Sequence, residues 1–114
     1  MKVLTVLVPT YNVEKYLRRC LDSLLLPEVL EEIEVLVVND GSKDGSADIA
    51  RAYEKKYPQT VVFVDKENGG HGSTINVGIE KAQGTYFKVL DSDDWVNIGD
   101  FIEFVKRLKE ETAD

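Results

Sequence analysis

A chain of 114 residues is expected to form one domain, long enough to bury a core and too short for a second domain. Its net charge of -7, without a basic cluster interleaved with aromatic residues, argues against nucleic-acid binding. The longest apolar runs are only a few residues, so no segment is predicted to span a membrane. Cys20 is the single cysteine, which excludes an intrachain disulfide and favours the cytoplasm, with the inner face of the membrane as an option for a longer protein.

Four short apolar runs predict strands, and each run is followed by a segment that predicts a helix. The strands are expected at residues 3–8, 33–38, 61–64 and 86–90. None of these runs alternates apolar with polar residues, which is the pattern of strands buried on both faces of a parallel sheet.

Capping residues and prolines delimit the first two helices. Asn12 is expected to cap the first helix, whose apolar residues recur at spacings of three and four and which ends before Pro27. Ser46 is expected to cap the second helix, which Pro58 stops.

The third helix is expected from about residue 73 to residue 83, after a glycine-rich turn, with Gly84 closing it. The fourth helix is amphipathic, and its apolar face carries Phe101, Ile102, Val105 and Leu108. This regular alternation of strand and helix, with a repeat of about thirty residues, is typical of βαβ units. The sequence therefore predicts a doubly wound α/β fold with a mainly parallel sheet and helices on both faces.

Polar residues follow every predicted strand. The loops in question are residues 9–12, 39–42, 65–71 and 91–95. Parallel strands end at the same edge of a sheet, and ligands bind beyond that edge, at the point where the strand order reverses. We therefore expect the four loops to form one binding face.

Asp91, Asp93 and Asp94 crowd three carboxylates into the turn after the fourth strand. In an extended segment residues two apart point the same way, so Asp91 and Asp93 are expected to face one divalent cation. Hard carboxylate oxygens suit Mg²⁺ or Mn²⁺. The alternative is a solvated turn in which one aspartate caps the next helix.

Other residues on this face suit a nucleotide. Tyr11 offers a flat apolar surface against which a base can stack. Asp40, when ionised, can accept the imide hydrogen of a pyrimidine or a ribose hydroxyl. His71 lies on the same face. Each of these three residues has a structural alternative: Tyr11 can pack over the helix start, Asp40 can form an Asx turn with Gly41, and His71 can cap or solvate a loop.

Four motifs, in the same order along nearly the whole chain, resemble the family 2 glycosyltransferases. They are Val8-Pro9-Thr10-Tyr11-Asn12, Val37-Val38-Asn39-Asp40-Gly41-Ser42-Lys43-Asp44, Glu67-Asn68-Gly69-Gly70 with Asn76-Val77-Gly78-Ile79, and Leu90-Asp91-Ser92-Asp93-Asp94. The resemblance implies the GT-A fold, a nucleotide-diphosphate sugar donor (very often a UDP-sugar), Mg²⁺ or Mn²⁺, and inverting transfer to an acceptor hydroxyl. Cell-wall or polysaccharide biosynthesis is the expected setting.

The resemblance also implies roles for single residues. Pro9 and Tyr11 correspond to the wall of the nucleoside pocket, and Asp40 corresponds to the acid that reads the base. Asp91 and Asp93 correspond to the Asp-x-Asp motif, with Asp91 facing the ribose or the sugar and Asp93 binding the metal.

The chain departs from the family pattern at two places. Thr74-Ile75 stands where the family often has Ala-Arg, whose arginine can touch the diphosphate. We expect Lys66 or His71 to supply that positive charge instead. Asn39 replaces the more frequent first aspartate of the Asp-Asp-Gly-Ser motif, a change expected to weaken little because Asp40 is kept.

The family places its catalytic base and acceptor site in a second half of the protein. The base is therefore expected beyond Asp114, and residues 1–114 are expected to form the nucleotide-sugar-binding domain of a longer glycosyltransferase. Apolar surface that the second half would cover is expected to permit homodimer formation.

Two other functions remain open from the sequence. The first is a nucleotide-sugar-binding module without catalytic activity. The second is a signalling receiver domain, which is also doubly wound around an acidic Mg²⁺ site. A receiver domain needs acids after its first strand, and residues 9–12 contain none, although Asp65 follows the third strand as a phosphoacceptor would.

Overall fold

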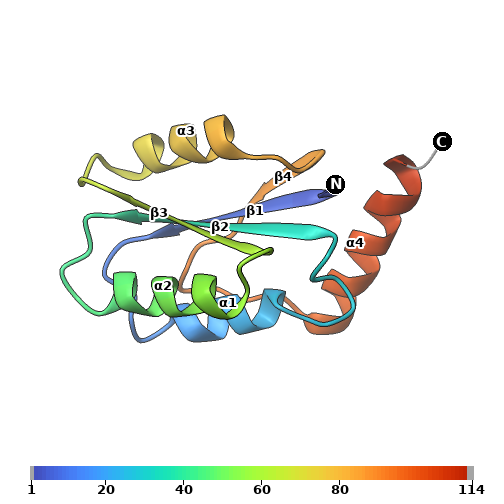
Figure 1. Ribbon diagram of the computed structural model, residues 1–114, viewed down its shortest axis with the longest axis horizontal. Helices are drawn as coiled ribbons and strands as arrows, with labels where there is room; N and C mark the ends of the chain where they lie inside the picture. The colour runs from blue at the N-terminus through green and yellow to red at the C-terminus, as the bar shows by residue number, and fades with distance from the viewer. Residues whose placement is uncertain (1, 113–114) are drawn as a thin grey trace.

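The predicted α/β fold is confirmed by the computed structural model, which describes residues 2–112. Strands and helices alternate along the chain, as Figure 1 shows. The elements are β1 Leu4–Thr10, α1 Leu17–Leu24, β2 Ile33–Asp40, α2 Ser46–Lys56, β3 Val61–Lys66, α3 His71–Lys81, β4 Tyr86–Val89 and α4 Ile98–Thr112.

The sheet has the strand order β3-β2-β1-β4, and all its neighbouring strands are parallel. The chain therefore moves outward from β1 to β3 and then returns to the other side of β1 to add β4. This return places the reversal of strand order between β1 and β4, which is where a doubly wound sheet binds its ligands.

Helices cover both faces of the sheet, as predicted. Helices α1, α2 and α4 lie on one face and α3 lies on the other (Figure 1). Alternate residues of β1 divide between the two layers, because Val6 packs into the larger cluster and Leu7 into the smaller one. Helix α3 approaches the sheet closely at Gly78, where an added Cβ would lie 2.6 Å from the Leu7 side chain.

The predicted boundaries of α1, α2 and α3 differ from those in the structure. Helix α1 begins at Leu17 rather than directly after Asn12, and no side chain caps it. Helix α3 ends with Ala82 in the capping position, so Gly84 lies beyond the cap. Gly84 instead donates its backbone N–H to Thr5 Oγ1 at 2.8 Å, which ties the α3–β4 connection to the sheet.

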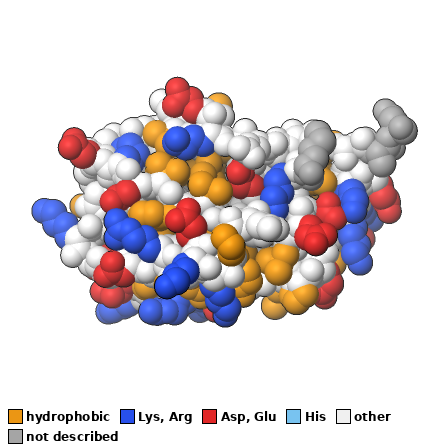
Figure 2. All heavy atoms as spheres, in the orientation of Figure 1, with side chains coloured by type: hydrophobic (Ala, Val, Ile, Leu, Met, Phe, Trp, Pro, Cys, Tyr) orange, Lys and Arg blue, Asp and Glu red, His pale blue; other side chains and the backbone are white. Residues whose placement is uncertain are grey.

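The viewed surface mixes acidic and basic side chains, and hydrophobic side chains gather below α3 (Figure 2). That position matches the smaller core cluster, whose outer members are only partly buried. Within residues 2–112, none of the helices is both long and apolar enough to cross a membrane.

Candidate functional site

A cavity of about 500 Å³ lies at the carboxyl edge of the sheet, beside the reversal of strand order. Its walls come from the carboxyl ends of β1 and β2 and from the segments that follow β1, β3 and β4. The lining residues are Pro9, Thr10, Tyr11, Val13, Asp40, Asn68, Gly70, His71, Thr74, Asp91, Ser92 and Asp93. The expectation that these segments lie together at one edge of the sheet is confirmed. Ligand binding at this face stays a prediction.

The cavity brings together six of the seven residues that the sequence marked for a ligand. They are Pro9, Tyr11, Asp40, His71, Asp91 and Asp93. Lys66 is absent from the wall, because its ammonium group points to Asp40 instead. Thr10, Val13 and Ser92 also line the cavity but were not predicted as ligand contacts, although Thr10 and Ser92 lie next to predicted site residues. The catalytic base expected beyond Asp114 lies outside the described residues.

The loop that carries Tyr11 is clamped to the loop that follows β2. Asn12 adopts a left-handed backbone with φ 51°. Its N–H donates to Ser42 Oγ at 3.0 Å, and its Oδ1 accepts from the Lys43 N–H at 2.8 Å. Asn12 therefore joins two loops rather than capping α1. These hydrogen bonds also hold the neighbouring Tyr11 in place, with its side chain 49% exposed to solvent.

Ser46 and Asp44 extend this clamp. Ser46 Oγ accepts from the Val13 N–H at 2.9 Å. Ser46 is the first residue of α2 and Gly45 holds the capping position, so the predicted Ser46 cap is wrong. Asp44 accepts from the Ser46 N–H at 3.0 Å and from the Glu14 N–H at 3.2 Å. Burial acts to raise the pKa of the Asp44 carboxyl, but these hydrogen bonds outweigh it and hold the pKa below its usual range.

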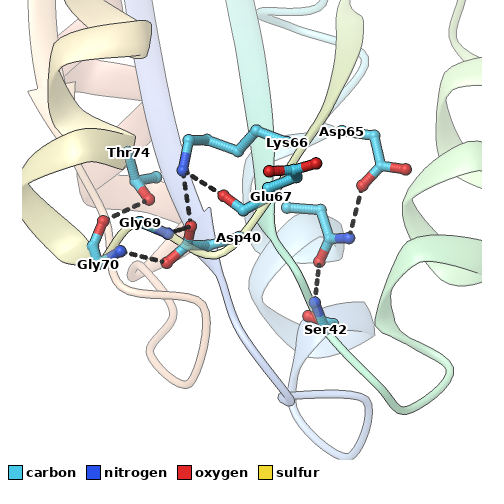
Figure 3. A network of polar contacts seen from close by, with 9 residues as sticks. Asp40, Ser42, Asp65, Lys66, Glu67, Gly69, Gly70 and Thr74 are labelled. Carbon is cyan, nitrogen blue, oxygen red and sulfur yellow. Dashed lines mark hydrogen bonds and ion pairs between the residues drawn. The ribbon is translucent and has the colours of Figure 1, made fainter.

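Asp40 ends β2 inside the cavity wall and is only 5% exposed. Figure 3 shows its carboxylate among the donors of the β3–α3 loop. Oδ1 accepts from Lys66 Nζ at 2.8 Å and from the Gly69 N–H at 2.8 Å, and Oδ2 accepts from the Gly70 N–H at 3.0 Å. Burial acts to raise the pKa of Asp40, and the bonds from Lys66, Gly69 and Gly70 lower it further than burial raises it.

The acidic turn presents Asp91 and Asp93 to the cavity, with Ser92 buried between them. The turn is closed by the Asp94 N–H, which donates to the Asp91 carbonyl at 2.9 Å. None of the three aspartates caps α4. That role belongs to Asn97, whose Oδ1 accepts from the Asp100 N–H at 3.0 Å. Asp91 and Asp93 therefore do not cap the helix, which is the role that the alternative interpretation offered.

Cys20 lies beneath the acidic turn and is fully buried. Its Sγ lies 3.8 Å from the Asp91 carbonyl oxygen. Burial, followed by the charges of Asp94, Asp93 and Asp91, raises the pKa of the Cys20 thiol to about 12. The thiol is therefore neutral at physiological pH and supplies packing rather than a nucleophile.

The donor set suits a cation that arrives with a phosphate group. Within residues 2–112, no three His, Cys, Asp or Glu side chains converge as a complete metal cage. Two carboxylates do line one cavity, and Mg²⁺ commonly binds to one or two carboxylates together with substrate phosphates. No Lys or Arg is among the described lining residues, so His71 is the only lining side chain that can carry a positive charge.

Comparison with known proteins gives a consistent result. The sequence matches the family described as Glycosyl transferase family 2 over residues 5–114. It is 41% identical over 98 residues to the minor teichoic acid biosynthesis protein GgaB of Bacillus subtilis, covering 85% of this chain and 11% of GgaB.

Two solved structures share the fold over almost the whole chain. S. aureus TarS 1-349 in complex with UDP-GlcNAc superposes with a TM-score of 0.81 and 33% identity, over 98% of this chain and 32% of TarS. The mannosyltransferase PcManGT from Pyrobaculum calidifontis, in complex with GDP-Man and Mn²⁺, gives a TM-score of 0.79 and 28% identity, over 97% of this chain and 32% of PcManGT. The chain thus spans about a tenth to a third of the length of these proteins.

Proposed function

This chain belongs to glycosyl transferase family 2, and we propose that residues 1–114 form the nucleotide-sugar-binding domain of a glycosyltransferase. The proposed donor is a UDP-sugar, and the proposed reaction is inverting transfer of the sugar to an acceptor hydroxyl. The relation to a teichoic acid biosynthesis protein supports a setting in cell-wall or polysaccharide biosynthesis.

One observation carries this proposal. Tyr11, Asp40 and the pair Asp91 and Asp93 come from three segments far apart in the sequence and line one cavity. A stacking surface, a hydrogen-bond acceptor and two cation ligands are the groups that a base, a ribose and a diphosphate require. TarS and PcManGT were solved with nucleotide sugars, which supports the same class of ligand here.

The charges in the cavity explain why a divalent cation belongs to the proposal. Asp40 is already paired with Lys66, while Asp91 and Asp93 face the cavity and would repel a diphosphate. A bound Mg²⁺ or Mn²⁺ would neutralise the departing diphosphate as a Lewis acid. Asp93 is the proposed principal ligand, and Asp91 is proposed to contact the ribose or the sugar. The Mn²⁺ in the PcManGT complex supports the use of a divalent cation.

Titration calorimetry of UDP with and without Mn²⁺ tests the proposal. The chain should bind UDP with Mn²⁺, and Asp93→Asn should weaken that binding at least about tenfold, since even indirect partners of a metal contribute that much. Asp48→Asn is the matched control, because the Asp48 side chain is 89% exposed on α2. Unchanged UDP affinity in Asp93→Asn would remove Asp93 from the metal site.

The alternative of a binding module without catalytic activity has its own test. Mass spectrometry of a UDP-sugar incubated with the chain and Mn²⁺ reports hydrolysis or transfer of the sugar. Membership of the glycosyltransferase family leaves the receiver-domain alternative without support. The cytoplasmic location and the homodimer stay predictions.

A further inference from the structure

The acceptor positions of Asp40 are almost fully used by the protein itself. A carboxylate offers about four acceptor positions, two on each oxygen. Lys66 Nζ and the Gly69 N–H take both positions on Oδ1, each at 2.8 Å. The Gly70 N–H takes one position on Oδ2 at 3.0 Å. One position remains, and it belongs to Oδ2.

Nucleobases differ in how many donors they offer to such a group. The pairing edge of uracil carries one N–H between two carbonyl oxygens. Guanine carries a ring N–H and an amino N–H side by side, a fork that engages both oxygens of a carboxylate. With Oδ1 occupied, one guanine donor would be left without a partner in a desolvated site, and an unpaired donor of this kind is costly.

We propose that Lys66 is a specificity-determining residue, which occupies Oδ1 of Asp40 and thereby selects a base with one imide N–H, such as uracil, over guanine. This inference rests on the proposed function of the cavity as a nucleotide site. Lys66 is a positioning residue, because it acts through Asp40 and does not line the cavity.

The surroundings of Lys66 hold it in this role. Its Nζ also donates to the Glu67 carbonyl at 2.7 Å (Figure 3). Its side chain is only 16% exposed. A Cβ added at Gly69 would lie 3.0 Å from Nζ, so the loop passes directly over the ammonium group. A swing of Lys66 toward a diphosphate would break both of its hydrogen bonds.

The test compares UDP with GDP, each titrated with Mn²⁺ into the 114-residue chain. The unmodified chain should prefer UDP by at least about tenfold, the effect of one unpaired buried donor. Lys66→Met frees one position on Oδ1 and should reduce this preference about tenfold, largely through tighter GDP binding. Lys66→Arg keeps a donor on Oδ1 and should retain the preference. Lys55→Met, on an exposed residue of α2, is the matched control.

The ratio of the two affinities separates this role from a merely structural one, because a loosened loop would weaken both nucleotides equally. Equal affinities in the unmodified chain, or an unchanged ratio in Lys66→Met, would overturn the inference and leave the nucleotide site standing. Binding of neither nucleotide would instead overturn the proposed function. The ratio in the unmodified chain needs no variant, so the inference remains testable if Lys66→Met does not fold.

Discussion

Replacement of Asn39 by aspartate should destabilise this chain, although aspartate is the residue that the family pattern favours there. Asn39 is 2% exposed at the end of β2, and its register partner on β3 is Asp65. Asn39 Nδ2 donates to Asp65 Oδ1 at 2.9 Å. Asn39→Asp would exchange that hydrogen bond for two carboxylates in contact.

The size of the effect follows from the geometry. Two unit charges 2.9 Å apart repel by about 1.4 kcal/mol in water and about 6 kcal/mol at an effective dielectric constant of about 20. The Asp65 side chain is 51% exposed and also pairs with Arg51, so solvent screening brings the repulsion toward the lower value. With the lost hydrogen bond added, the free energy of unfolding should fall by about 2 kcal/mol.

Thermal and urea unfolding, followed by circular dichroism, measure this change. Tm should fall by roughly 8 °C, since about 1 kcal/mol corresponds to roughly 4 °C for a domain of this size. Repulsion raises the pKa of one carboxyl of the pair in the folded variant. Protonation of that carboxyl relieves the repulsion, and this relief is fully present below the ordinary pKa of about 3.9 and is lost as the pH rises through the raised pKa. The variant should therefore lose more unfolding free energy at neutral pH than at about pH 4.

The double variant Asn39→Asp with Asp65→Asn is the control for this reasoning. It exchanges amide and carboxylate across the same pair of strands, restores one donor and one acceptor, and should recover most of the lost stability. An Asn39→Asp variant as stable as the unmodified chain would refute the argument, as would a double variant no more stable than the single one.

Three further predictions follow from the site. Tyr11→Ala should weaken UDP binding by about tenfold or more through lost stacking, with little change in Tm because Tyr11 is 49% exposed. The calorimetric control is Tyr16→Ala, because Tyr16 is 45% exposed and lies outside the cavity. Equal losses of UDP affinity in both variants would contradict a stacking role. Removal of the metal with EDTA should abolish most of the affinity for UDP. The affinity for uridine, which lacks phosphates, should stay unchanged, and equal losses for both ligands would argue against a cation on the diphosphate. Asp44→Ala should lower the free energy of unfolding by about 1 kcal/mol through loss of two backbone hydrogen bonds. The pKa of Asp44 is lowered in the folded chain, so its contribution is present above about pH 3.9, the unfolded value. It is lost as the pH falls further, through the lowered pKa of the folded chain. A difference in Tm that stays constant on acidification would contradict the role.

The sequence predicted the sheet and the convergence of the segments after its strands because both depend on local signals. Apolar runs mark strands, and the carboxyl ends of parallel strands must share an edge, so the convergence of Tyr11, Asp40 and Asp93 followed without knowledge of any contact. The start of α1 was missed for the opposite reason. Asn12 bonds to Ser42 and Lys43, about thirty positions away in the sequence, and helical periodicity carries no information on such pairs.

The same limit explains why Lys66 was expected at the diphosphate. From the sequence it was a lysine in a polar loop, equally able to reach a ligand or a neighbour. Its position at the end of β3, in register with Asp40 on β2, settles which of the two it meets. The cavity therefore keeps Asp91 and Asp93 without a lysine or arginine among the described lining residues. A diphosphate brought there needs a cation that the ligand itself helps to bind. Affinity for the metal and affinity for the diphosphate should on this reasoning rise together, so that Mn²⁺ alone binds weakly and Mn²⁺ with UDP binds well.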